Sequence, residues 1–340
     1  MPSVPGASPE AVGATGGASA SSSPAAAAWT PIAEEAARAT RVKHPTDRLP
    51  RPVRRRVLAV ANQKGGVGKT TSTVNLAAGL ALQGLRTLVV DLDPQGNAST
   101  ALGVEHRAGT PSVYEVLLGE IGIVDAVAVS PQSSNLLCVP ATIDLAGSEI
   151  ELVSMVARES RLCRALPDVA LDELGVDYVF IDCPPSLGLL TVNALVAAPE
   201  VLIPIQCEYY ALEGLGQLLR NIELVQAHLN PALTVSTILL TMYDGRTKLA
   251  DQVTAEVRKH FGDQVLHTVI PRSVKISEAP GFGQTVLAYD PGSRGALSYL
   301  DAAREIALAR GYLAGGNLGR ADLDDGYPGG AHSGARGVSR

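Results

Sequence analysis

The stretch Asn62-Gln63-Lys64-Gly65-Gly66-Val67-Gly68-Lys69-Thr70-Thr71 lies between two apolar runs. The run before it, residues 57–61, is short and apolar, which predicts a buried strand of a parallel sheet. The run after it, residues 74–82, is longer, and we interpret it as a helix. A strand, a glycine-rich loop and a helix in this order are the setting of a phosphate-binding loop.

The glycines of the loop explain why it suits a phosphate. Without a Cβ, successive backbone N–H groups can turn toward one anion, and the positive end of the following helix dipole adds to the attraction. Lys69 can reach the outer phosphates of a nucleotide, and the hydroxyl of Thr70 can bind Mg²⁺. The predicted ATP contacts in this stretch are Lys64, Gly65, Gly66, Val67, Gly68, Lys69, Thr70 and Thr71.

The loop carries a second lysine, Lys64, and departs from the usual phosphate-loop pattern. Gln63 stands where the first glycine of G-x-x-x-x-G-K-[ST] belongs. Two interpretations of Lys64 stay open from the residues alone. It is either a solvated lysine on a loop or a cation aimed at nucleotide phosphate, as an arginine finger is.

Acidic residues end two further predicted strands. Residues 87–91 run into Asp93, and the apolar run 177–182 ends in Asp182. The carboxyl ends of parallel strands form the edge where α/β proteins bind ligands, so these carboxylates are expected beside the phosphate loop. For Asp91 and Asp93, turn and cap chemistry is the alternative. The predicted magnesium ligands are Thr70, Asp93 and Asp182.

Four strings together resemble the ParA/MinD group of P-loop ATPases with a deviant Walker A loop, and chromosomal, Soj-type ParA proteins in particular. They are KGGVGKT at 64–70, DLDPQGN at 91–97, DCPPS at 182–186 and QCEYYALEG at 206–214. The resemblance runs through about residues 57–312. It implies an α/β fold, doubly wound around a mainly parallel sheet.

The resemblance also implies roles for individual residues. In this group ATP is sandwiched between two subunits, and the added lysine, here Lys64, crosses to the partner's nucleotide. Asp93 would orient the hydrolytic water, and Asp182 would support the metal. The implied catalytic residues are Lys64, Lys69, Asp93 and Asp182.

The later part of the chain supplies the expected adenine and DNA contacts. Strands are expected at 235–242 and 265–270, and the resemblance implies that Met242 and Pro271, at their ends, face the adenine. A local excess of basic residues follows the first of these strands. Scattered solvated charge is one interpretation, and a sequence-independent phosphate-binding face is the other. The predicted DNA contacts are Arg246, Arg272, Lys275 and Arg294.

Composition limits the classes of protein that fit. The chain has 340 residues with a net charge of −6, so any nucleic-acid contact needs a local basic patch. The four cysteines form no C-x-x-C pair and are expected to be reduced core residues. No apolar run approaches the length of a membrane span, about 20 residues. The start of the sequence has no recognisable export signal.

The two ends differ in composition from the middle. Residues 1–53 are rich in Ala, Ser, Gly and Pro and 313–340 in Gly, so both are expected to be disordered around an ATPase domain at 54–312. Trp29 and Ile32 stand out in the first segment as a short helix that could dock on a partner, or as part of an undocked tail. Its basic end could contact DNA phosphate or serve as a solvated linker. The arginines concerned are Arg48, Arg51, Arg54, Arg55 and Arg56.

The resulting hypothesis is a cytoplasmic, nucleoid-associated switch that acts in DNA partitioning. ATP and Mg²⁺ would drive a homodimer that binds non-specific duplex DNA, and a ParB-like centromere-binding protein would stimulate slow hydrolysis. One alternative is a membrane-associated ATPase of the MinD type, which residues 315–340 disfavour because they have no apolar face. Another is a metabolic enzyme on the same fold, either an amide-forming ligase, which would need a glutaminase-type domain, or a reductase with an iron–sulfur cluster.

Overall fold

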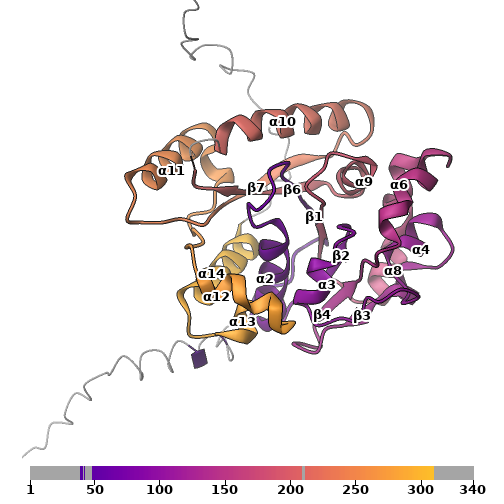
Figure 1. Cartoon of the computed structure of the whole chain (residues 1–340), viewed down its shortest axis with the longest axis horizontal. Coiled ribbons are helices and arrows are strands. Elements are labelled where there is room, and N and C mark those ends of the chain that lie inside the picture. The colour runs from indigo at the N-terminus through magenta and orange to yellow at the C-terminus, as the bar shows by residue number, and fades with distance from the viewer. Residues whose placement is uncertain (1–38, 41, 43–47, 209–210, 310–340) are drawn as a thin grey trace, which may run out of the picture.

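One twisted sheet of seven strands organises the molecule (Figure 1). The computed structural model describes residues 39–40, 42, 48–208 and 211–309. The strand order is β3-β4-β2-β5-β1-β6-β7, and β3 alone of these seven runs antiparallel to its neighbour. The strands are β1 Arg56–Val60, β2 Thr87–Asp91, β3 Ala128–Val129, β4 Leu136–Val139, β5 Tyr178–Asp182, β6 Glu200–Gln206 and β7 Thr234–Thr241.

Helices cover both faces of the sheet. Strand side chains point alternately to the two faces, and here both sets are apolar, so each face needs a layer of helices to bury it. In β1, Leu58 and Val60 enter one cluster of buried side chains and Ala59 the other. In β5, Phe180 and Ile181 separate in the same way. The helices are α2 Lys69–Leu82, α3 Asn97–Ala101, α4 Val113–Leu118, α5 Ile123–Ala126, α6 Leu145–Val153, α7 Arg161–Ala165, α8 Asp168–Glu173, α9 Leu189–Ala197, α10 Ala211–His228, α11 Lys248–Phe261, α12 Val274–Glu278, α13 Val286–Tyr289 and α14 Arg294–Leu308.

The helices divide between the two faces. Buried side chains of α2, α3 and α12–α14 share one cluster, and those of α4–α11 share the other. Figure 1 shows α2 beside α14, and they approach closely at Gly79, where an added Cβ would lie 2.9 Å from the Cβ of Ala303. The predicted doubly wound, mainly parallel α/β fold is therefore confirmed, and α2 is fixed in place by a helix more than 200 residues later in the chain.

The prediction of a regular strand at 265–270 is wrong. The N–H groups of Leu266 and Ile270 donate to carbonyls of β7, at 3.0 and 2.8 Å, so the segment does lie along the edge of the sheet. Between them, the N–H groups of 267–268 donate instead to the carboxylate of Glu305 in α14, at 2.5 and 3.0 Å. Because the Glu305 carboxylate accepts from these backbone N–H groups, the segment does not form regular hydrogen bonds with β7, and only isolated bridges remain.

The end of the basic run is bound to the domain itself. Arg55 donates to the carboxylates of Asp168 and Asp172, the former at 2.9 Å. Arg56 forms a two-pronged pair with Glu200, with N–O distances of 2.8 and 2.6 Å, and Glu200 is almost fully buried. These two guanidinium groups are therefore neither a solvated linker nor free for DNA.

The division into a domain at 54–312 with disordered segments at 1–53 and 313–340 stays a prediction, since most of both ends lies outside the described residues. Described residues of the first segment nevertheless contact the domain. Val42 is fully buried, and the N–H of Leu49 donates to a carbonyl at the end of α2. Among the described residues, no helix has both the length and the hydropathy of a membrane span.

Candidate functional site

The glycine-rich loop connects the carboxyl end of β1 to the start of α2. Gly66 and Gly68 have φ values of +74° and +88°, a backbone region that residues with a Cβ rarely adopt. A Cβ added at Gly65 or Gly66 would meet no atom within 4 Å, so the outer side of the loop is open. The loop thus leaves space beside backbone N–H groups at a helix N-terminus, which is the requirement for binding an anion.

Two side chains outside the motif hold the loop in shape. The hydroxyl of Thr241, at the end of β7, donates to the carbonyl of Val67 at 2.8 Å in a buried contact. Asn62 donates to the carbonyl of Pro204 at 2.8 Å and accepts from the N–H of Lys64 at 3.0 Å. Neither residue is among the predicted site residues. The place of Asn62 next to the loop is a signal that could have identified it, whereas nothing local identifies Thr241.

The two lysines of the loop point to different surroundings. Lys69 is 7% exposed, and its Nζ lies 3.3 Å from the carbonyl of Lys64, over the loop. Burial lowers the pKa of Lys69, and the nearby carboxylate of Asp182 opposes that change. The Lys64 side chain is 34% exposed, and its Nζ contacts Oε2 of Glu208 at 3.0 Å. Lys69 therefore serves the chain's own loop, while Lys64 extends away from it.

The carboxylates of Asp91 and Asp182 end neighbouring strands in register, as the sequence predicts. Asp182 is fully buried and accepts from the Thr73 hydroxyl at 2.9 Å through one oxygen. Its other oxygen has no hydrogen-bond partner among the described residues. Burial, followed by the nearby Asp91, raises the pKa of Asp182 to about 8. A buried oxygen without a donor is the kind of group that a metal-bound water or a metal would satisfy.

Asp91 and Asp93 have different surroundings. Asp91 is fully buried and accepts from the N–H and hydroxyl of Ser99 at 2.9 and 2.7 Å, so it fixes the loop before α3. Burial raises the pKa of Asp91 to about 6. Asp93 is 8% exposed, accepts from the N–H of Gln95 at 3.0 Å and follows the carboxyl end of β2 by two residues. Cap chemistry therefore accounts for Asp91, whereas the bond from Gln95 uses only one of the two oxygens of Asp93.

The residues at this edge fit a magnesium nucleotide. Within the described part of the chain, no group of three or more His, Cys, Asp or Glu side chains could by itself hold a metal ion. A metal here would therefore take oxygens from a phosphate and from water, together with the hydroxyl of Thr70 beside Asp182. This mixed set of hard oxygen ligands is the one that Mg²⁺ prefers.

The predicted adenine residues lie next to the loop. Met242 follows directly after Thr241, whose hydroxyl holds the loop, and has a φ of +51°, unusual for a residue with a side chain. Tyr243 pairs with Pro271 in a parallel bridge. The structure thus brings Met242 and Pro271 together beside the phosphate loop, and their contact with adenine stays a prediction.

Two of the four predicted DNA contacts lie at the turn after β7 and the segment alongside it. Arg246 is exposed and forms a two-pronged pair with Asp244, at 2.9 and 2.7 Å. This contact lowers the pKa of Asp244 to about 2, and the charge of Arg272 contributes. Arg272 is exposed, and it donates its backbone N–H to the carbonyl of Tyr243 at 3.0 Å.

The other two lie on neighbouring helices. Lys275 in α12 is exposed and contacts Glu278 at 3.2 Å. Arg294 is exposed at the start of α14, and the adjoining Gly295 packs against Ile276 of α12. The four basic residues are therefore all exposed and occupy one region, but neighbouring carboxylates already pair with Arg246 and Lys275.

Comparisons with known proteins agree with this geometry. A family model described as an AAA domain matches residues 55–235. The sporulation initiation inhibitor protein Soj of Bacillus subtilis is 54% identical over 252 residues, which is 74% of this chain and 98% of that protein. The chromosome partitioning protein ParA of Caulobacter vibrioides is 52% identical over 251 residues, 74% of this chain and 93% of that protein.

A solved structure with the same fold is named cobyrinic acid a,c-diamide synthase, from Mycobacterium smegmatis, with bound ADP and magnesium. It has a TM-score of 0.62 and 42% identity, and the match covers 73% of this chain and 92% of that one. Sequence, topology and the loop with its second lysine lead to one family. The chain belongs to the ParA/Soj family of P-loop ATPases.

Proposed function

We propose that this protein is an ATP-dependent switch for DNA partitioning, which acts on chromosome or plasmid copies. The observation that carries the proposal is the partly exposed Lys64, whose ammonium contacts Glu208 and not its own loop, at the start of a loop that is otherwise complete for phosphate. The names of the relatives, chromosome partitioning protein ParA among them, support the cellular role.

In this proposal, ATP binds at Lys64–Thr71, with Lys69 on the outer phosphates and Met242 and Pro271 at the adenine. Mg²⁺ would be held by Thr70, Asp93 and Asp182, and it would supply charge neutralisation on the phosphates. Asp93 orients the attacking water, because its carboxylate is close enough to Lys69 of the loop to contribute to the pKa of that lysine. Slow hydrolysis to ADP and phosphate without a partner is expected, as in ATPases that act as timers.

The surroundings of the two lysines support dimerisation. Lys69 is buried over its own loop, so the loop's own phosphate charge already has a cation. Lys64 is partly exposed and extends away from the loop, which suits a contact with nucleotide bound to a second subunit. We propose an ATP-dependent homodimer in which each Lys64 neutralises charge on the partner's phosphates.

The dimer would bind non-specific duplex DNA through Arg246, Arg272, Lys275 and Arg294. These side chains are exposed in one region, and two subunits would double the number of phosphate contacts. ATP binding would thereby control DNA binding. A ParB-like centromere-binding protein would stimulate hydrolysis and release the DNA, and the protein would be found in the cytoplasm, on the nucleoid.

The decisive experiment measures binding to a non-specific DNA duplex with no nucleotide, with ADP and with ATP. Wild type is expected to bind with ATP in a salt-sensitive way, and Lys64→Ala is expected to bind ATP but not DNA. A double variant, Arg272→Ala with Arg294→Ala, should bind DNA at least ~10-fold more weakly at constant salt. Arg164→Ala removes an exposed arginine on α7 and should change nothing. DNA binding that is equal in all nucleotide states would refute the switch.

A second candidate function is an ATP-dependent amide synthesis, which the name of the M. smegmatis structure favours. That chain is similar to this one over nearly all of its length, so the fold does not separate the two functions. The test is ATP hydrolysis with glutamine or ammonia and a corrinoid carboxylic acid. Turnover that requires both co-substrates, without any response to DNA, would establish the enzyme in place of the switch.

A further inference from the structure

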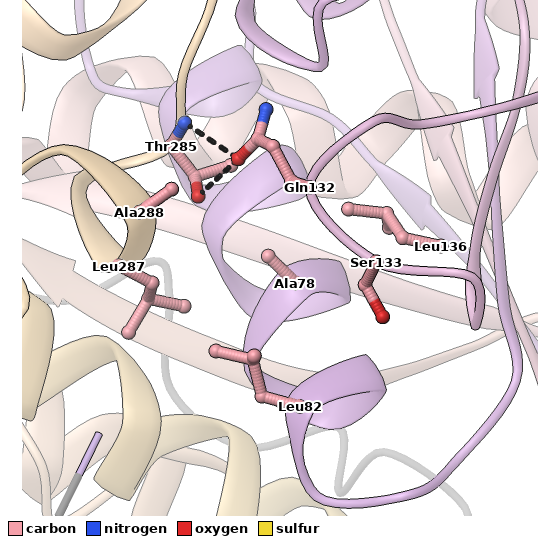
Figure 2. Close-up of a pocket in the computed structure, with 8 residues that line it drawn as sticks. All are labelled: Ala78, Leu82, Gln132, Ser133, Leu136, Thr285, Leu287 and Ala288. Carbon is pink, nitrogen blue, oxygen red and sulfur yellow. Dashed lines mark hydrogen bonds between the residues drawn. The ribbon is translucent and has the colours of Figure 1, made fainter. Parts of the chain in front are cut away.

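A small apolar pocket of about 250 Å³ opens on the face of the molecule that carries α2 and α13 (Figure 2). Ala78 and Leu82 of α2 form its floor, and Leu287 and Ala288 of α13 form one wall. The residues that line it are Ala78, Leu82, Gln132, Ser133, Leu136, Thr285, Leu287 and Ala288. The site lies along the second half of α2, whereas the phosphate loop precedes its first residue, so it is distinct from the nucleotide site.

The polar groups of the pocket are already used within the protein. The carbonyl oxygen of Gln132 accepts from the N–H and hydroxyl of Thr285 at 3.0 and 2.8 Å. The amide nitrogen of Gln132 donates to the carbonyls of Ala101 and Gly283 at 2.9 and 3.2 Å. A group bound in this pocket would therefore contact mainly carbon atoms and few free hydrogen-bonding groups. Such a pocket suits an apolar side chain better than a polar metabolite.

The N-terminal segment of the chain reaches the domain at this side. The N–H of Leu49 donates at 3.1 Å to the carbonyl of Gln83, the residue after Leu82 of the pocket floor. The side chain of Arg48 packs against Gly84. Val42 is fully buried and belongs to the same cluster of buried side chains as Ala78 and Leu287. Described residues on both sides of 43–47 thus contact the domain on the face that carries the pocket.

The sequence before Val42 has one apolar face. Residues 39, 40 and 42 are helical, with Val42 buried, Ala39 half-buried and Thr40 exposed. Continued backward at helical spacing, the buried face carries Ala36 and Ile32, and Trp29 precedes Ile32 by three residues. Thr30 and Pro31 are typical of a helix start.

Charged residues border this apolar stripe: Glu35 and Arg38, seven and four residues before Val42, lie on the side nearest Val42, and Glu34 lies on the opposite side. Glu34 and Arg38 are four residues apart in the favourable orientation on a helix. A helix over residues 31–42 would span about 18 Å, so the segment is long enough to lie across the end of α2. We propose that residues 31–42 form a helix that docks on its own domain, with the indole of Trp29, just before the helix, in the pocket formed by α2 and α13.

Trp29 is the single tryptophan of the chain, so its fluorescence reports on this contact directly. In the full-length protein we expect blue-shifted emission and acrylamide quenching several-fold weaker than in denaturant. Ala288→Phe places a ring at the exposed rim of the pocket. It is expected to shift the emission to that of exposed indole and to restore quenching. Ala232→Phe, at an exposed alanine between α10 and β7, is the matched control and should leave both unchanged.

Three results would overturn the proposal. In the first, Trp29 in the wild type is quenched as freely as in denaturant. In the second, Trp29 is protected but equally so in Ala288→Phe, which would place it elsewhere. In the third, protection disappears on dilution, which would make a second copy of the chain the occupant. Unchanged circular dichroism and unfolding midpoint in Ala288→Phe establish that the variant is folded. None of these readouts depends on ATP or DNA.

Discussion

The ammonium of Lys64 and the carboxylate of Glu208 lie 3.0 Å apart in the same chain. Glu208 is itself held by the side-chain amide of Gln206, which donates to its other oxygen. In the proposed dimer the side chain of Lys64 contacts the nucleotide of the other subunit. The ion pair with Glu208 therefore has to break before the Lys64 ammonium can reach that nucleotide. Both side chains are partly exposed, and such a pair contributes no more than about 1 kcal/mol.

Removing Glu208 should therefore favour the dimer by a modest factor. We expect Glu208→Ala to lower the ATP concentration needed for half-maximal dimerisation up to ~5-fold, because a solvated Lys64 has no pair to break. Multi-angle light scattering across an ATP titration measures this. Glu223→Ala, an exposed glutamate farther along α10, is the control. Weaker dimerisation in Glu208→Ala would mean that the carboxylate acts within the dimer instead.

The bond from Thr241 to the carbonyl of Val67 should matter for nucleotide binding. Thr241→Val has nearly the same shape but leaves a buried carbonyl without its donor, a loss of about 1–3 kcal/mol. We expect the affinity for a fluorescent ATP analogue to fall ~10-fold or more while the fold is kept. Thr237→Val, on the same strand, has a hydroxyl that contacts Ser236 and not the loop, and it should bind normally. Equal affinity in both variants would show that the loop needs no support from β7.

The raised pKa of Asp182 predicts a dependence of stability on pH. In the folded state Asp182 holds its proton up to about pH 8, whereas in the unfolded chain it loses it near its ordinary pKa of about 4. The native state thus binds more protons in this interval, and the free energy of unfolding falls as pH rises, by at most about 1.4 kcal/mol per pH unit. Below pH 4 this stabilisation is fully present, and above pH 8 it is lost.

Asp182→Asn removes that titration. Urea unfolding between pH 5 and 8, without nucleotide or magnesium, should show a flatter pH dependence in Asp182→Asn than in wild type, with the variant the more stable at pH 8. Asp263→Asn changes an exposed carboxylate and should keep the wild-type slope. Parallel pH profiles for wild type and Asp182→Asn would contradict the raised pKa.

Gly79 offers a test of the packing between α2 and α14. A helical glycine is normally about 1 kcal/mol worse than alanine, so helix propensity alone predicts that Gly79→Ala stabilises the protein. The new Cβ would lie 2.9 Å from the Cβ of Ala303, and the overlap should reverse the sign to a loss of about 1–3 kcal/mol. The double variant Gly79→Ala with Ala303→Gly should recover part of this loss in urea unfolding. A more stable single variant would show that α14 can move away.

Local sequence patterns predict the centre of the sheet well. The strand before the phosphate loop, the strand ending at Asp91 and the one ending at Asp182 all lie within a residue of their predicted positions. Each is a short apolar run bounded by polar residues, and such runs fold as parallel strands wherever both faces are covered. The common edge of these strands then brings Asp93 and Asp182 to the loop without further information.

The contacts that escaped prediction join distant parts of the chain. Thr241 bonds a loop residue 174 positions earlier, and Arg55 pairs with Asp168, 113 positions later. No local pattern encodes such pairs. The segment at 265–270 has the composition of a strand, but Glu305 takes two of its N–H groups, and this competition depends on where α14 packs.

The guanidinium of Arg56 joins Glu200 and the carbonyl of Ile306 at the amino end of β1, with the phosphate loop at the other end of the same strand. A pull on the N-terminus would act first on the contacts of Val42 and Leu49, and where it reached β1 it would act on ion pairs at the amino edge, about 16 Å of strand away from the nucleotide. A fluorescent protein or surface tether attached to residue 1 would apply force to these contacts and leave the geometry of the phosphate loop intact. The N-terminus is accordingly the better attachment point for imaging or single-molecule force experiments on this protein.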